Sequence, residues 1–130
     1  MPAQFKASLI TPEAIVLETD ITSAKIPAFD GLVGILTHRA PLLAKLGTGV
    51  LTLGTTSGAQ RFLVTGGYAQ MKDEELTILT TEAIPAAQIN AQTIAAEQAK
   101  LGNITGIDLS AMEKRQAIEA RISAMRSLSA

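Results

Sequence analysis

The chain has 130 residues, a formal net charge of -1, 47% hydrophobic residues and 18% charged residues. A chain of this kind forms one compact soluble core with an appendage, which excludes a disordered protein. The absence of cysteine excludes a disulfide framework and a thiolate metal site, and it fits a reducing compartment. Three Phe, one Tyr and no Trp leave few rings for stacking on bases, and the near-neutral charge provides no large basic face for nucleic acid.

The first half of the chain has the pattern of short strands joined by turns. Phe5, Ala7 and Leu9 alternate with polar residues, which predicts a strand with one buried face. The Thr-Pro-Glu stretch at 11–13 predicts a turn. Residues 14–26 are rich in β-branched side chains and predict two strands.

A hairpin is predicted around Ser57-Gly58-Ala59, because glycine allows the positive φ of a tight turn. Gly66-Gly67 indicates a bulge or a close backbone approach, and residues 72–75 predict a turn into a last strand at 76–81. Strands at this spacing favour a β-sandwich or a flattened barrel. The alternative is an open sheet covered by the C-terminal helices.

The composition changes at Pro85. All five prolines, all the aromatic residues and eight of the ten glycines lie at or before it, and the remainder is rich in alanine and charged residues. We therefore expect a β-sandwich domain over residues 1–84 and a helical hairpin domain over residues 85–130.

The first helix of the hairpin is expected to start at an Asn90 cap and to run to about Leu101, where Gly102 provides a left-handed stop. Ser110 and Glu113 have the spacing of a capping box for the second helix. Helices of roughly 11 to 16 residues are marginal in water alone, so these two must pack on the β domain or on a partner.

The second helix has one apolar stripe, and Arg115 can pair with Glu119 across one turn. The stripe consists of Ala111, Ile118, Ile122 and Met125. The alanines of both helices each bury little apolar area, so the hairpin can detach at a modest free-energy cost. This property allows a regulatory role.

The stretch DGLVGILTHRAPLLAKLGTG, residues 30–49, contains the only histidine, His38, beside Arg39. Histidine catalysis usually needs an orienting carboxylate and a nucleophile or metal, and only Asp30 is near in sequence. No motif of a metalloprotease, a nucleophile elbow or a P-loop occurs in the chain. We therefore expect His38 to be a surface loop residue, and we expect no catalytic and no metal-binding residue.

Gly31 and Gly34 in the same stretch are interpreted as turn and packing residues, because a phosphate loop requires a helix to follow. Pro41 and the residues after it predict a turn or a very short helix. In the second helix, Lys114, Arg115, Arg121 and Arg126 are nearly balanced by acidic residues. They are interpreted as a solvated face, with a weak contact to an acidic partner as the alternative.

The N-terminal half resembles the epsilon subunit of F-type ATP synthases, equivalent to the mitochondrial delta subunit. The resemblance runs from ITPEAIVLETDITSAKIPAFDG through GILTHRAPLLAKLGTG to LVTGGYAQM and LTILTTEA. The family pattern G-x-x-G-x-L-P-x-H-A-P-L is matched at Gly31, Gly34, Leu36, Ala40, Pro41 and Leu42.

Two residues depart from this pattern. Thr37 stands at the family's proline and Arg39 at its histidine, so His38 occupies the variable position. Arg39 keeps a hydrogen-bonding cation there, with a longer reach and a permanent charge.

The resemblance implies a ten-stranded β-sandwich followed by an antiparallel two-helix hairpin. It also implies a non-catalytic rotor subunit of the central stalk, held by gamma, resting on the c-ring, and coupling proton flow to ATP synthesis. By motif position, the residues that contact the c-ring or gamma are Gly31, Leu32, Arg39 and Ala44. The cations that could contact the catalytic alpha/beta head and regulate hydrolysis are Lys114, Arg115, Arg121 and Arg126.

Some family members bind ATP through an I/L-D-x-x-R-A motif, and the corresponding stretch here is INAQTI. Asn90, Thr93 and Ile94 replace the aspartate, arginine and alanine, so we expect no bound nucleotide and no cofactor. The short second helix with little net charge also indicates weak inhibition of ATP hydrolysis. The alternative function is a free-standing small-molecule-binding β-sandwich whose helices form a lid.

No apolar run reaches the roughly 20 residues that span a bilayer, so any contact with the membrane is expected to be peripheral, through the complex only. The start of the chain lacks a basic segment followed by an apolar one, so we expect no signal peptide. Length and the lack of a transit peptide favour a bacterial protein at the cytoplasmic face of the inner membrane.

Overall fold

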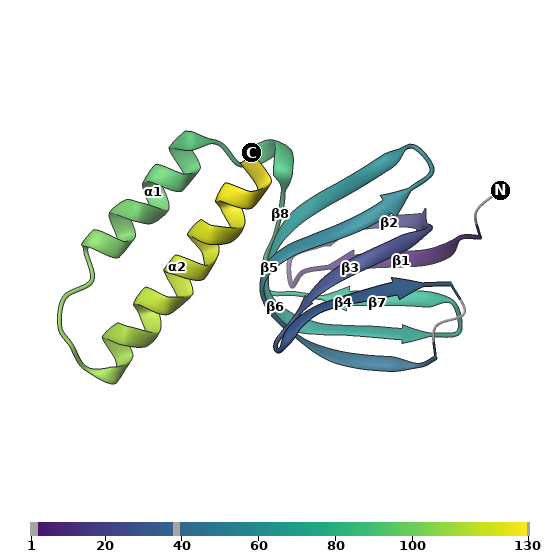
Figure 1. The fold of residues 1–130 in the computed structure, drawn as a ribbon, viewed down its shortest axis with the longest axis horizontal. Helices are drawn as coiled ribbons and strands as arrows, with labels where there is room; N and C mark the ends of the chain where they lie inside the picture. The colour runs from purple at the N-terminus through teal and green to yellow at the C-terminus, as the bar shows by residue number, and fades with distance from the viewer. Residues whose placement is uncertain (1–2, 38–39, 130) are drawn as a thin grey trace.

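A computed structural model describes residues 3–37 and 40–129. Its strands lie together as one body, and two antiparallel helices extend beside them (Figure 1). The elements are β1 (Phe5–Ile10), β2 (Ile15–Ile21), β3 (Ser23–Ala28), β4 (Gly31–Leu36), β5 (Leu42–Thr55), β6 (Gly58–Lys72), β7 (Glu75–Leu79), β8 (Ala83–Pro85), a 3-10 turn (Ala86–Gln88), α1 (Ala91–Gly102) and α2 (Leu109–Ser129).

The strands form one continuous hydrogen-bonded sheet in the order β2-β1-β7-β6-β5-β3-β4, with β8 paired to β6. All neighbours are antiparallel except β1 and β7. The expected β-sandwich followed by two helices is confirmed. The described residues form eight strands rather than ten, because β5 and β6, of 14 and 15 residues, each continue without interruption through both layers.

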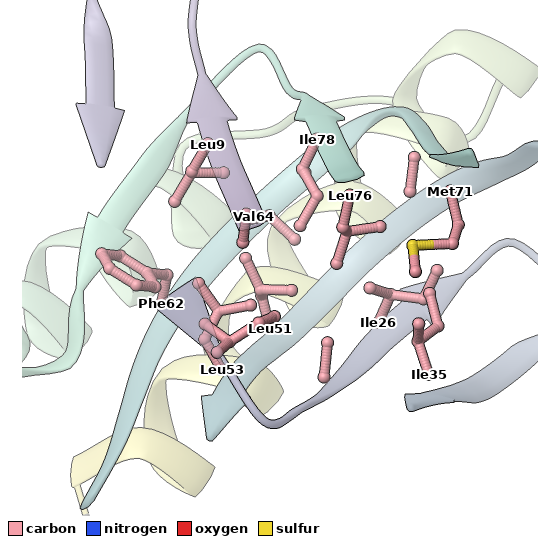
Figure 2. Close-up of a cluster of buried hydrophobic side chains, with 14 of the residues drawn as sticks. Leu9, Ile26, Ile35, Leu51, Leu53, Phe62, Val64, Met71, Leu76 and Ile78 are labelled. Carbon is pink, nitrogen blue, oxygen red and sulfur yellow. The ribbon is translucent and has the colours of Figure 1, made fainter. Parts of the chain in front are cut away.

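The main core lies inside the sandwich, where side chains from most strands point toward one another (Figure 2). Phe5, Ala7 and Leu9 are all buried, as their alternation predicts. The other fully buried large side chains of this cluster are Ile21, Ile26, Ile35, Leu51, Leu53, Val64, Met71, Leu76 and Ile78.

The predicted close backbone approach occurs at Gly67. Its φ is +108°, and a Cβ atom placed on it would overlap the carbonyl oxygen of Leu79. Only glycine fits there, because it lacks a Cβ and tolerates positive φ. The turn predicted at 72–75 is also present, with Asp73 and Glu74 at positive φ.

The hairpin packs on the outer surface of the sandwich through α2, which lies between α1 and the strands (Figure 1). A second buried cluster joins Leu63 of β6 to Ile89 and to the end of α2, at Ala124, Met125 and Leu128. The residues predicted as the apolar stripe of this helix are buried or half-buried.

The first helix starts as predicted but ends differently. The Asn90 side chain accepts hydrogen bonds from the backbone N–H groups of Gln92 and Thr93. Gly102 lies inside α1 without positive φ, and Asn103 follows in a right-handed conformation. A left-handed stop is not needed, because the N–H of Asn103 satisfies the Lys100 carbonyl in a tightened last turn.

The second helix starts one residue before the expected Ser110 cap. Asp108 Oδ1 accepts the backbone N–H of Ala111 at 3.0 Å, so aspartate is the capping side chain and Ser110 lies inside α2. Arg115 does not pair with Glu119 as predicted. Its guanidinium donates to the Gly106 carbonyl at 2.6 Å.

The segment after Pro41 was expected to be a turn or a short helix, and this expectation is wrong. It is the first part of β5, paired with β6. Leu42, Ala44 and Leu46 turn inward while Leu43 and Lys45 are exposed, which is the alternation of a strand. The glycines and the proline of this stretch obscure that period.

Candidate functional site

The contact residues predicted within the stretch at 30–49 lie around the turn between β3 and β4, beside the start of β5. The backbone N–H of Phe29 donates to the Lys45 carbonyl at 2.7 Å, which holds the turn against β5. Gly31 at the turn has φ of +137°, a conformation that glycine adopts without strain. The local sequence therefore holds the turn against the first part of β5.

Large apolar side chains are exposed around this turn. Phe29 is 73% exposed and Leu43 is 70% exposed. A hollow of about 390 Å³ lies between them, and Ala44 and Lys45 also line it. We call Phe29, Leu43, Ala44 and Lys45 the docking patch. Contiguous exposed apolar side chains of this kind are typical of a protein contact surface.

A cation accompanies the apolar side chains. Lys45 Nζ lies 5.1 Å from the centroid of the Phe29 ring, a cation–π distance. The side chain thus covers part of the ring while its charge stays available to an acidic or carbonyl partner. Leu32, at the start of β4, is also 72% exposed.

A charged cluster lies where the hairpin meets the sandwich. Arg121 of α2 places Nη2 at 3.2 Å from Glu97 Oε1 of α1, and Nη1 at 2.8 Å from Glu82 Oε1 beside β8. The contact with Glu97 is a hydrogen bond, whereas Glu82 Oε1 is an ion-pair partner without hydrogen-bond alignment. Lys100 Nζ also bonds Glu97 Oε1, at 3.1 Å.

These contacts shift the ionisation of both central groups. Burial alone would raise the pKa of Glu97, but the hydrogen bonds from Arg121 and Lys100 outweigh burial and lower it. Burial likewise opposes the charge of Arg121, and its two carboxylate neighbours raise its pKa nevertheless. Both shifts therefore favour the charged forms of Glu97 and Arg121.

The family model described as ATP synthase, Delta/Epsilon chain, beta-sandwich domain matches residues 4–86. The chain belongs to the ATP synthase delta/epsilon family. An epsilon chain from Nitrobacter hamburgensis is 32% identical over 111 residues, covering 82% of each chain. A chloroplastic epsilon chain from Emiliania huxleyi is 37% identical over 114 residues, covering 88% of this chain and 85% of the relative.

An epsilon chain from Rhodopirellula baltica is 43% identical over 77 residues, which is 59% of this chain and 60% of that relative's length. Two solved structures share the fold of this delta/epsilon chain. A chain of the Euglena gracilis mitochondrial ATP synthase superimposes with a TM-score of 0.84 at 20% identity, covering 98% of this chain and 82% of the other. A chain of the Tetrahymena thermophila central stalk and c-ring gives 0.75 at 20% identity, with 96% of each chain covered.

The family predicted from the sequence is thus confirmed, and with it membership of an ATP synthase complex. Within residues 3–37 and 40–129, no group of His, Asp and Glu side chains is arranged to hold a metal ion. No helix in the same ranges has the length and apolar character needed to cross a bilayer.

The structure brings some of the predicted contact residues of this delta/epsilon chain together. Gly31 and Leu32 lie at the β3–β4 turn, and Ala44 lines the hollow beside it. His38 and Arg39 lie outside the described residues, so the prediction for Arg39 stays a prediction.

The two most exposed apolar residues of the docking patch, Phe29 and Leu43, were not predicted from the sequence. Phe29 lies in the β3–β4 turn, and Leu43 stands on the outward face of β5, and both positions normally carry polar side chains. An exposed apolar residue cannot be recognised until the strand period is known, and the period of β5 was not identified.

The four cations of α2 separate into two groups. Arg121 is only 20% exposed at its side chain and is bound between two carboxylates, so it is not part of a solvated face. Lys114 and Arg126 are exposed, and Arg115 is occupied at the Gly106 carbonyl. The buried Glu97 was not predicted, since its partner lies 24 residues away.

Proposed function

We propose that this chain is a non-catalytic rotor subunit of a proton-translocating F-type ATP synthase, linking gamma to the c-ring in the central stalk. Family membership supports this proposal. So does the fold that this chain shares with a chain of the Tetrahymena thermophila mitochondrial ATP synthase central stalk and c-ring. The docking patch carries the proposal, because a subunit that transmits force needs an exposed contact surface rather than a reactive centre.

The docking patch and the neighbouring turn provide the contact with the c-ring or gamma. Phe29 and Leu43 each contribute on the order of 1.5 to 3 kcal/mol when fully covered by a partner. Gly31, Leu32 and Ala44 complete the surface, and Arg39 bonds a carboxylate or carbonyl of a c-ring loop. Such contacts transmit torque without bond chemistry.

We place the division between the sandwich and the hairpin domain after residue 84, near the end of β8, which still pairs with β6. The complex lies at the cytoplasmic face of a bacterial inner membrane, and this chain is peripheral there. The bacterial relatives favour this location over the organellar one that the chloroplastic relative represents.

The proposal is tested by purifying the tagged full chain from gently solubilised membranes. The double variant Phe29→Ser with Leu43→Ser should recover much less gamma and c-ring and should lower proton-driven ATP synthesis in membrane vesicles. Ile107→Ser is the matched control, because Ile107 is 92% exposed on the helix-connecting loop and outside the patch.

Equal recovery of partners by the double variant and the control would remove the docking patch from the proposal. Arg39→Glu is a third variant, and unchanged assembly and coupled synthesis with it would remove the Arg39 contact. If the unaltered chain were recovered alone while the synthase stayed intact, the rotor role itself would be rejected.

A further inference from the structure

The two helices of the hairpin are held in different ways. α2 rests on β5 and β6, whereas α1 rests chiefly on α2 (Figure 1). The buried apolar cluster that joins hairpin and sandwich takes its helical members from the end of α2, and α1 adds only the half-buried Ile94. The attachment of α1 therefore depends on its contact with α2.

The face of α1 that packs on α2 has a charged residue, Glu97, at its centre. Ile94, Glu97 and Leu101 are spaced three and four residues apart and form one stripe. Glu97 is the only fully buried residue of α1, at 5% exposure, and both apolar neighbours are half-buried. A carboxylate at such a position is unfavourable unless a cation satisfies it.

Arg121 satisfies that carboxylate from α2 and at the same time reaches the sandwich. One of its terminal nitrogens lies 3.2 Å from Glu97 Oε1, and the other lies 2.8 Å from Glu82 Oε1. A planar guanidinium can hold two carboxylates at once in this way. Lys100, 63% exposed at its side chain, contacts Glu97 only from the solvent side.

The attachment of α2 is of another kind. Ala124, Met125 and Leu128 are buried against Leu63 and Ile89, and this contact contains no charge. Loss of the Arg121 charge removes one ion pair to the sandwich but leaves the apolar contact in place. The hairpin is thus held by a charge-dependent contact of α1 with Arg121 and by an apolar contact of α2 with the sandwich.

We propose that Arg121 is a two-armed latch and that the hairpin opens in two steps. In the first step the arm to Glu97 breaks and α1 leaves α2, while α2 stays on β5 and β6. In the second step α2 leaves the sandwich. The latch belongs to the free chain, and it exists whether or not the docking patch binds the c-ring.

Amide hydrogen exchange of the purified full chain tests this order, because it reports opening helix by helix. Glu97→Gln retains the shape of the side chain but removes its charge. In this variant, exchange of the α1 amides after the first turn should rise about tenfold or more, since the ion pairs of Glu97 with Arg121 and Lys100 are lost and a neutral amide accepts a weaker hydrogen bond. Amides at 124–128 should exchange more slowly than those of α1 in both proteins, because α2 opens only after α1.

Arg121→Met should raise exchange in α1 by the same factor and exchange at 124–128 by a larger one, because the Glu82 arm between α2 and the sandwich is lost too. Lys114→Met is the matched control, since it removes an exposed cation from the same helix, and it should change neither helix. Lys100→Met should have a smaller effect than Arg121→Met, because the Lys100 side chain is 63% exposed to solvent.

Two results would overturn the latch. One is unchanged exchange in α1 when either Glu97 or Arg121 is replaced. The other is equal protection of α1 and of residues 124–128 in the unaltered chain, which would mean that the hairpin leaves as one body. Glu97→Gln keeps the test valid if Arg121→Met fails to fold, because it leaves Arg121 paired with Glu82.

Discussion

Gly67 is the residue where local geometry most strictly limits the side chain. An added Cβ would overlap the backbone of Leu79, and the φ of +108° is unfavourable for any L side chain. Gly67→Ala should therefore lower the free energy of unfolding by at least about 2 kcal/mol, measured by chemical denaturation. Gly34→Ala is the control, since a Cβ added at Gly34 would meet nothing within 4 Å and the φ there is ordinary. Equal stability of the two variants would contradict this account of the β6–β7 contact.

Glu97 gives the chain a defined pH dependence. Its pKa is lower in the folded state than the ordinary value of 4.5, so it contributes stability above pH 4.5 and loses that contribution as pH falls through the folded pKa. The free energy of unfolding should fall on acidification through this window. Glu97→Gln should be less stable than the unaltered chain at neutral pH, and the difference should shrink in acid. A difference that stays constant over this range would contradict the prediction.

The Glu97 charge interacts with groups from three segments, which define what the pH experiment measures. Lys100 from α1 and Arg121 from α2 contact the Glu97 carboxylate, and Glu82 faces Arg121 from beside β8. The comparison with Glu97→Gln isolates the first arm, because Glu82 is present in both proteins.

At the scale of elements, the start of α1 determines whether nucleotide can bind. The side chains of Asn90 and Thr93 are occupied by a reciprocal capping box with the backbone of this turn. Neither carries a charge with which to grip a phosphate. Calorimetric titration with ATP should therefore give no binding at physiological concentration. A dissociation constant below a millimolar would contradict this prediction.

The elements also show which parts of the sequence were informative. Alternation in β1, glycine at the β5–β6 turn and asparagine before α1 each act over a few residues, and each prediction was correct. The start of β5 was missed because glycine and proline outweighed its alternation. The Glu97–Arg121 contact was missed because it depends on how two helices pack. A charged residue between Ile94 and Leu101, on the inward stripe, was the available signal.

At the scale of the whole molecule, the hairpin must be weighed as a regulator of the complex. Arg121 is engaged inside the fold and Arg115 is bound to the Gly106 carbonyl, so the compact chain presents few of its α2 cations to the catalytic head. Removing the chain after Gly102 should therefore raise membrane ATPase activity only slightly. A large rise would show that the hairpin inhibits hydrolysis strongly.

Truncation alone does not separate inhibition from damage, because losing α2 uncovers Leu63 and Val50 on the outside of the sandwich. Glu97→Gln is the better-matched probe, since it retains the whole hairpin and removes only the Glu97 arm of the latch. If the extended hairpin inhibits, this variant should hydrolyse ATP more slowly than the unaltered complex, whereas the truncation should hydrolyse it faster. If both rates equal that of the unaltered complex, the hairpin serves the stability of the stalk rather than its regulation.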